Sequence, residues 1–244
     1  MSFKSVLITG ANRGIGLGLT RQLLSATEPP IHLIATTRQS TNPDLDQLVE
    51  QYPNLHVLKL EGKDYKSFDT FAKQVADIVG DHGLDVLINN AGIKFDQSLS
   101  DVSPEQMVEN IEVNAVVPLF LTRSLLPVLR IASSKRKTLV INVTSMLGSI
   151  GMFDEISDFN ISAYPYRASK AALNMITKQL SHDLKADNIL VVGLHPGWLK
   201  TDMGGQEAPQ EVDTTCADLL TVMRNVVSEH RGKIIDFRGN VLPY

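Results

Sequence analysis

Residues 6–16 of this chain read VLITGANRGIG, and this stretch decides the fold. A short apolar run ends in a glycine-rich turn, and residues 17–25 follow with the pattern of a helix. A strand, such a turn and a helix in this order begin many dinucleotide sites, because glycine allows a tight turn and a close approach of the backbone to phosphate. The free N–H groups at the helix start would then face the anion. The alternative is an ordinary strand-to-helix turn.

The rest of the chain repeats the alternation of strand and helix. Apolar runs predict strands at residues 31–37, 55–60, 84–88, 139–143, 189–194 and 233–236, and helical patterns lie at 44–51, 65–79, 104–131, 166–186 and 212–227. The run at 84–88 is apolar throughout, as expected of a parallel strand that is covered on both faces. We therefore predict one α/β domain over residues 1–244, a Rossmann-type doubly wound parallel sheet of about seven strands with helices on both faces.

Composition narrows the class of protein. The 244 residues are 43% hydrophobic and 20% charged, with a net charge of −4. These values fit one globular domain with a sizeable core, and they predict no nucleic-acid partner and no membrane partner. Cys216 is the single cysteine, so the chain cannot form an internal disulfide. No apolar run has the length of a bilayer span. From these two observations we expect a cytoplasmic protein. The six histidines lack metal-ligand spacing, and we expect no metal site.

The second predicted strand ends in Thr36-Thr37-Arg38. Many dinucleotide sites have an acid here that binds the ribose 2′-hydroxyl, whereas this chain has a guanidinium. Arg38, together with Arg13 from the glycine-rich turn, suits a 2′-phosphate because a guanidinium pairs with phosphate oxygens. The pattern favours NADP over NAD, although both arginines could instead face solvent.

Tyr166 and Lys170 are one helical turn apart and precede the apolar run at 171–176. Side chains at this spacing share a helix face, and an ammonium beside a phenol lowers a phenol pKa that starts at about 10. Such a phenol can act as a general acid or base, but the same pair also occurs on ordinary helices. Tyr164 is a decoy, because Ala168 and not a lysine follows it four residues later.

Other polar residues follow the predicted strands at the edge where open α/β sheets bind ligands. The turn Asn89-Asn90-Ala91-Gly92 and the pair Thr144-Ser145 each end a strand, and the asparagines could bind a ribose or only local backbone. Asn114 lies in an apolar part of a helix, where its amide must bond a neighbouring loop or hold a water. We interpret His195 as a turn residue.

Two segments near this edge, residues 146–163 and 198–212, have no helix or strand pattern. We expect the first to be an irregular surface loop beside the cleft and the second to fold over bound ligands. Four apolar residues in these segments suggest a substrate pocket or serve only in packing: Met146, Phe153, Phe159 and Trp198.

The order and spacing of these motifs resemble the short-chain dehydrogenase/reductase family over nearly the whole chain. The motifs that carry the resemblance are TGxxxGIG at 9–16, NNAG at 89–92, Asn114, Ser145, Tyr166 with Lys170, and Pro196-Gly197 with Thr201. The text around Tyr166 most resembles the sniffer-type carbonyl reductases. Two features depart from the family pattern. Glu61-Gly62 stands where an Asp and an aliphatic residue usually contact adenine, and the stretch from 145 to 166 is longer than usual, as it is in the sniffer-type branch.

The resemblance implies an NADPH-dependent reduction of a carbonyl, in an aldehyde, ketone or quinone, to an alcohol. Tyr166 would be the general acid and Lys170 would lower its pKa, while Ser145 would bind the carbonyl oxygen and Asn114 would hold a water. The implied partners are a small-molecule carbonyl and further copies of the chain, in a possible homodimer or homotetramer. The implied cofactor contacts are Gly10, Asn12, Arg13, Gly14, Ile15, Gly16, Arg38, Asn90, Ala91, Gly92, Asn114, Tyr166, Lys170, Pro196, Gly197 and Thr201. Two other functions stay open: an NADP-binding sensor or scaffold with residual activity, and an alcohol dehydrogenase that works with NAD(P) in the oxidative direction.

Overall fold

A computed structural model describes residues 3–157 and 162–244, and its centre is a single sheet with the strand order β3-β2-β1-β4-β5-β6-β7-β8. All neighbouring strands run parallel except β8, which pairs antiparallel with β7. The strands are β1 (Ser5–Ile8), β2 (His32–Thr37), β3 (Leu55–Lys59), β4 (Val86–Asn89), β5 (Thr138–Val143), β6 (Ile189–His195), β7 (Ile234–Asp236) and β8 (Val241–Leu242). The predicted doubly wound sheet is confirmed, with one short strand more than predicted.

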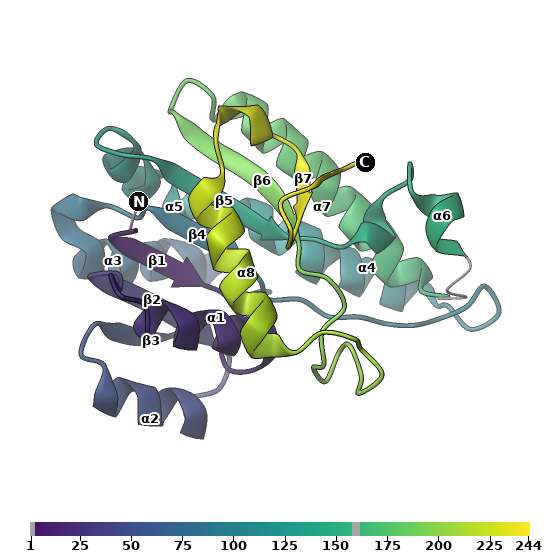
Figure 1. The fold of residues 1–244 in the computed structure, drawn as a ribbon, viewed down its shortest axis with the longest axis horizontal. Coiled ribbons are helices and arrows are strands. Elements are labelled where there is room, and N and C mark those ends of the chain that lie inside the picture. Colours follow the sequence, from purple (N-terminus) through teal and green to yellow (C-terminus); the bar gives the residue numbers. More distant parts are fainter. Residues whose placement is uncertain (1–2, 158–161) are drawn as a thin grey trace.

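Helices cover both faces of this sheet (Figure 1). α1, α2 and α8 pack on one face, and α3, α5 and α7 pack on the other. The helices are α1 (Gly14–Leu24), α2 (Pro43–Gln51), α3 (Phe68–Val79), α4 (Pro104–Ile111), α5 (Val117–Ser133), α6 (Phe153–Ser157), α7 (Tyr164–Asp183) and α8 (Val212–Asn225). This winding reverses between β1 and β4, so the carboxyl ends of these two strands border a crevice suited to a ligand.

The helix starts follow the local signals in the sequence. Ser103 caps α4 through a reciprocal pair of hydrogen bonds, because its hydroxyl accepts from the Gln106 N–H at 3.3 Å and its own N–H donates to the Gln106 side chain at 2.9 Å. Pro104 occupies the first helical position, where a missing N–H costs nothing. This cap fixes where the long helical segment behind the cleft begins.

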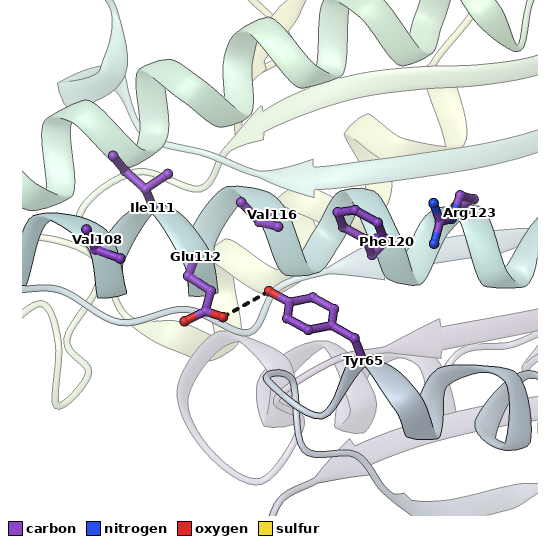
Figure 2. A pocket seen from close by; sticks show the side chains of 7 residues that line it. All are labelled: Tyr65, Val108, Ile111, Glu112, Val116, Phe120 and Arg123. Carbon is purple, nitrogen blue, oxygen red and sulfur yellow. Dashed lines mark hydrogen bonds between the residues drawn. The ribbon is translucent and has the colours of Figure 1, made fainter. Parts of the chain in front are cut away.

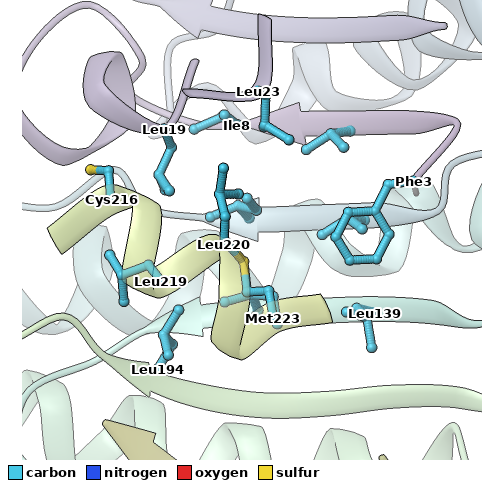
Figure 3. Packing of buried hydrophobic residues seen from close by; sticks show 14 of the residues in the cluster. Phe3, Ile8, Leu19, Leu23, Leu139, Leu194, Cys216, Leu219, Leu220 and Met223 are labelled. Carbon is cyan, nitrogen blue, oxygen red and sulfur yellow. The ribbon is translucent and has the colours of Figure 1, made fainter. Parts of the chain in front are cut away.

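The core lies in two apolar layers, one on each side of the sheet. Figure 3 shows the layer under α8, where Leu219, Leu220 and Met223 pack against Leu19 and Leu23 of α1 and against strand residues such as Ile8. The strands contribute to both layers because alternate side chains of a strand point to opposite faces. A sheet buried on both faces gives its strand ends a rigid position.

Three sequence predictions need correction. The helix predicted at 104–131 is interrupted by one turn of π-helix at Glu112–Val116. The segment at 146–163 is not wholly irregular, because it contains a 3₁₀ turn (Met146–Gly148) and α6. The last predicted strand continues into a hairpin, whose strand β8 is two residues long and too short to show a pattern.

The prediction that no segment has the length and apolarity of a membrane span is also wrong. The helical rod Pro104–Ser133 meets that requirement by length and composition. Half of its most apolar window is buried inside the protein. Length and composition alone are weak evidence that this helix crosses a membrane, because core helices of soluble proteins can have the same length and apolarity.

Candidate active site

The carboxyl ends of β1, β2 and β4 open into a cleft of about 700 Å³. The glycine-rich turn forms one wall, the segment after β3 forms another, and Tyr166 and Lys170 of α7 lie at the far end. Motifs that are more than 150 residues apart in the sequence line this one cleft. It is the position at which a doubly wound sheet binds its ligand.

The glycines of the turn are required by geometry. Gly10 and Gly14 have φ angles of +63° and +53°, in the left-handed region that glycine adopts without strain. A Cβ on Gly16 would lie 2.4 Å from the Gly10 carbonyl oxygen and 2.7 Å from the Asn90 amide nitrogen, so only glycine fits. The turn is therefore pressed against the start of α1 and against the turn after β4.

The side chains of Asn90 and Thr9 hold these two turns together. The Asn90 amide donates to the carbonyl oxygens of Thr9 (2.8 Å) and Gly10 (3.2 Å). The Thr9 hydroxyl oxygen accepts from the backbone N–H groups of Asn90 and Ala91, each at 3.0 Å. The Asn90 side chain thus bonds local backbone, one of the two alternatives that the sequence left open, while its residue still lines the cleft.

The amino terminus of α1 is free to bind an anion. Arg13 occupies the N-cap position, where its side chain makes no capping hydrogen bond within the described part of the chain, and the first turn carries no acid. The N–H groups at this end keep their donor capacity, and the helix dipole adds positive charge. Glycines that admit close approach, together with these donors, fit the phosphates of a dinucleotide.

Arg38 and Arg13 differ in their surroundings. Arg38 is exposed on the cleft wall beside Thr37 and forms no ion pair among the residues that the structure describes. Arg13 pairs with Asp202 at 2.6 Å, although both side chains are largely exposed. Arg38 is thus ready to receive a phosphate group, whereas Arg13 would have to share or leave Asp202. The Arg13 contact stays a prediction.

The Tyr166 hydroxyl forms a hydrogen bond with the Ser145 hydroxyl, which lies just beyond the end of β5. Burial raises the pKa of Tyr166 to about 12, the hydrogen bond from Ser145 opposes the shift, and the charge of Asp96 adds to it. The sequence predicted a lowered Tyr166 pKa, whereas the net shift is upward because desolvation is its largest cause. The role of Lys170 in setting this pKa stays a prediction. A phenol with this pKa is protonated at neutral pH and able to donate.

Lys170 is buried, with 5% of its surface exposed, beneath the cleft. Its ammonium donates to the Val143 carbonyl oxygen at 2.8 Å and lies 5.5 Å from the centre of the Tyr166 ring. Burial lowers the pKa of Lys170 to about 8. The helical spacing predicted from sequence does bring the two side chains together, and a charged lysine so near a phenol is a strong local field.

Asn114 lies in the π-helical turn between α4 and α5 and is buried. Its amide nitrogen donates to the Ile93 carbonyl oxygen (2.8 Å) and the Ser169 hydroxyl (2.9 Å), and its amide oxygen accepts from the Ile93 N–H (2.9 Å). It thus ties the loop after β4 to α7 directly behind Tyr166. This matches the sequence alternative of a bond to a neighbouring loop, and π-helical turns often mark functional sites.

Two supporting residues were missed or misread from the sequence. His195 is not a turn residue but the last residue of β6, buried, and its Nδ1 accepts from the Met146 N–H at 3.3 Å. Burial lowers the pKa of His195 to about 4, which keeps it a neutral acceptor beside Ser145. Asn174 binds the Thr144 hydroxyl (2.6 Å) and the Gly148 carbonyl oxygen (3.1 Å), and so fixes the segment around Ser145 to α7.

The loop after β6 folds back on itself and on the glycine-rich turn. Gly197 has a φ of +93°, and the Gln210 side chain accepts from the Trp198 N–H at 2.6 Å, so the two ends of the loop meet. Thr201 faces Gly14 and, like Pro196, lines the cleft. The prediction of a segment that covers the cleft fits this position. Phe159, one of the predicted pocket residues, lies outside the described residues.

A second hollow, of about 630 Å³, lies on the outer side of α4 and α5 (Figure 2). Figure 2 shows the Tyr65 hydroxyl bonded to Glu112, at 3.3 Å, with Val108, Phe120 and Arg123 along the helices. The hollow is mostly apolar and lies apart from Tyr166 and Ser145. None of the residues that line it also lines the cleft.

A family model described as short chain dehydrogenase matches residues 4–212. The chain belongs to the short-chain dehydrogenase family. The match covers the whole cleft, from the glycine-rich turn to the loop after β6.

Several relatives resemble this short-chain dehydrogenase over most of its length. The carbonyl reductase Sniffer of D. melanogaster is 35% identical, with both chains covered completely and a TM-score of 0.94. An NADPH-bound carbonyl reductase from chicken fatty liver is 36% identical, again over both full chains, with a TM-score of 0.95. The C-signal protein of Myxococcus xanthus is 38% identical over 162 residues, which cover 66% of this chain and 93% of that protein.

Most residues predicted for the site of this short-chain dehydrogenase lie together. The cleft is lined by Gly10, Asn12, Arg13, Gly14, Ile15, Arg38, Asn90, Ala91, Gly92, Tyr166, Lys170, Pro196 and Thr201. Gly16, Asn114, Ser145 and Gly197 lie behind or beside this surface and act on it through the contacts described above. The cleft is also lined by residues that the sequence did not predict, among them Thr36, Gln39, Lys63, Asp64 and Met203. Glu61 and Gly62, which depart from the family pattern at the position that usually contacts adenine, line the cleft as well.

Proposed function

We propose that this short-chain dehydrogenase reduces a carbonyl group to an alcohol with NADPH. One observation carries the proposal: the Tyr166 hydroxyl, bonded to Ser145, lies at one end of a cleft. The other end presents the glycine-rich turn and Arg38, which forms no ion pair with any described residue. The likeness to carbonyl reductases at 35% and 36% identity supports it. The substrate class would be small aldehydes, ketones or quinones.

The roles of the residues follow from their chemistry. The glycine-rich turn and the start of α1 would hold the diphosphate, and Arg38 would bind the 2′-phosphate. NADPH would supply the hydride to the carbonyl carbon. The carbonyl oxygen would accept hydrogen bonds from Ser145 and Tyr166, and these donors stabilise the negative charge that grows on that oxygen.

Proton transfer would come from Tyr166. Its hydroxyl proton would move to the carbonyl oxygen, and the C=O double bond would become a C–OH group. The positive charge of Lys170, 5.5 Å from the ring centre, would stabilise the phenolate that remains. Asn114 and Ser169 would keep α7, and with it Tyr166, in position against the cleft.

The test is NADPH oxidation with a panel of aldehydes, ketones and quinones. Tyr166→Phe should lower kcat by about 10²- to 10⁴-fold, the usual contribution of a general acid, and leave NADPH binding nearly unchanged. Tyr164→Phe is the matched control, because Tyr164 lies on the same helix and is 49% exposed. Full activity of Tyr166→Phe would overturn the assignment.

Cofactor choice is tested separately. Arg38→Asp should weaken NADPH binding by roughly 10- to 100-fold, the loss of a charge-assisted hydrogen bond, and change NADH binding far less. Lys59→Asp, an exposed residue of β3 outside the cleft, makes the same charge change and should leave both affinities unaltered. Equal losses for NADPH and NADH would show that Arg38 does not read the 2′-phosphate.

A sensor or scaffold function is the second candidate, and the relative that favours it is the M. xanthus protein named C-signal. Tight NADPH binding without turnover across the whole carbonyl panel would support this reading. An oxidative alcohol dehydrogenase would instead show turnover with alcohols and NAD(P) and little reduction. The same set of assays therefore separates the three functions.

We also propose that a second copy of the chain covers the hollow on α4 and α5. Its lining is apolar between Glu112 and Arg123, so a two-fold contact would bring opposite charges of the two copies together. Val108 is 64% exposed there, and Val108→Glu should shift the protein to a monomer in light scattering. A monomeric wild-type protein would refute this part of the proposal.

A further inference from the structure

Three histidines that are far apart in the sequence lie side by side at the amino-terminal end of the sheet. His32 begins β2, His56 is the second residue of β3, and His82 lies in the 3₁₀ turn Gly80–His82 before β4. The ring centre of His32 is 5.6 Å from that of His56 and 6.2 Å from that of His82. This end of the sheet is opposite to the cleft, so the proposed reaction gives these residues no role.

The distance between one ring nitrogen of His32 and one of His56 is compatible with a shared metal ion. His32 Nδ1 and His56 Nε2 are 3.4 Å apart, which is long for an N–H···N hydrogen bond. Two imidazole nitrogens on one tetrahedral Zn²⁺, each at about 2.0–2.1 Å from the metal, are separated by about 3.3–3.4 Å. The contact is thus a long hydrogen bond in the structure, and its spacing equals that of two imidazole nitrogens on one metal ion.

The pair of imidazoles is also accessible to an ion. Both side chains are only half-buried, so an ion can reach them from solvent.

We propose that His32 and His56 bind one divalent transition-metal ion of the zinc type, with water in the other coordination positions. Among the described residues no three His, Cys, Asp or Glu side chains converge on a single point, so the site has two protein ligands. Imidazole is a preferred ligand of zinc, copper and nickel and a poor one for magnesium. His82 is exposed, and the centre of its ring is 6.2 Å from that of His32, so we leave it out of the pair of ligands.

Metal binding here would connect the edge strand β3 to β2. His56 belongs to β3, which has a neighbour on one side only, and His32 lies diagonally across the ladder in which Ile34 faces His56. The unfolded chain does not hold these two nitrogens together, so the ion would bind the folded state and raise its stability. The site is therefore a structural clamp rather than part of the reaction.

Calorimetric titration of the untagged, chelator-treated protein with ZnCl₂ tests the proposal. The wild-type protein should bind one equivalent, and His32→Ala and His56→Ala should each weaken binding by roughly tenfold or more. His82→Ala and the distant His182→Ala are matched controls and should bind as the wild type does. Absence of saturable binding, unchanged affinity in the first two variants, or an equal loss in His82→Ala would overturn the assignment.

Thermal unfolding supplies a second measurement that does not depend on activity. Zn²⁺ should raise the Tm of the wild type and of the His82 variant, and it should not raise the Tm of His32→Asn, which keeps a polar side chain. MgCl₂ at the same concentration should produce no shift, because imidazole is a poor magnesium ligand. An equal shift with Mg²⁺, or a full shift in His32→Asn, would show that the two nitrogens form only a weak hydrogen bond.

Discussion

Replacing Lys170 with Met should remove activity but not stability. The two side chains have similar volume, so the helix position stays filled. Burial lowers the pKa of Lys170 from 10.5 to about 8, a difference of about 2.5 units, or about 3 kcal/mol at 1.36 kcal/mol per unit. This free energy measures how much the buried charge disfavours the folded state at neutral pH.

The loss of one hydrogen bond opposes the gain. Met cannot donate to the Val143 carbonyl oxygen, and a buried acceptor without a partner costs about 1–3 kcal/mol. We expect Lys170→Met to be between unchanged and about 2 kcal/mol more stable than the wild type at pH 7. If burial of the Lys170 charge did not destabilise the folded state, replacing Lys170 with Met would be neutral or destabilising.

The pH dependence gives the sharper test. Between pH 8 and pH 10.5 the unfolded chain holds the Lys170 proton and the folded chain does not, so the stability of the wild type rises with pH in this window. The advantage of the Met variant should therefore shrink by roughly 2 kcal/mol between pH 7 and pH 10. Tyr166 and all other groups titrate in both proteins and largely cancel from the difference.

Urea unfolding followed by circular dichroism, at pH 7 and pH 10, measures this difference. Lys178→Met is the control, since Lys178 is an exposed lysine of the same helix, and it should change the unfolding free energy by less than about 0.5 kcal/mol at both pH values. A Met variant that is more than about 2 kcal/mol less stable at pH 7, with a difference that does not vary with pH, would refute the reasoning.

Three further predictions concern the residues that support the site. Gly16→Ala should cost at least about 2 kcal/mol of unfolding free energy and weaken NADPH binding, because its Cβ would meet the Gly10 carbonyl oxygen at 2.4 Å; urea unfolding and a binding titration measure both. Ser103→Ala should cost about 1 kcal/mol in the same unfolding assay, through loss of the α4 cap, and an unchanged midpoint would contradict this. The pKa of His195 is lowered from 6.5 to about 4, so between pH 4 and pH 6.5 the folded state binds fewer protons than the unfolded state. The free energy of unfolding should therefore fall by up to about 3 kcal/mol as the pH drops from 6.5 to 4. His195→Gln should flatten this pH dependence, and an unchanged slope would exclude His195 as its source.

Lys170 and Tyr166 are held in fixed positions by the surrounding fold. A buried ammonium and a buried phenol are held in place by α7, by Asn114 and by the end of β5. Such groups need no rearrangement when charge develops on a substrate oxygen, and preorganisation of this kind is a large part of enzymatic rate enhancement. The cost in stability is offset by the two apolar layers around the sheet.

The sequence by itself determined the sheet, its parallel winding and most of the cleft. These features depend on short-range patterns, namely apolar runs, glycines in a turn and a tyrosine four residues before a lysine, so they are visible in the order of residues. It also located the start of the helix at Pro104, whose Ser103 cap is a local pair of hydrogen bonds. The partial failure at residues 104–131 has a local reason too, because a π-helical turn keeps the apolar pattern of the helix that it interrupts.

Only the tertiary structure decided what depends on burial and on distant neighbours. It placed His195 against Met146, tied Arg13 to Asp202, and raised the Tyr166 pKa where the sequence had predicted a lower one. It also gathered His32, His56 and His82, whose separations of 24 and 26 residues give no periodic signal. A pKa and a distance between two side chains depend on the groups that fold around them, and the sequence near each side chain does not contain these groups.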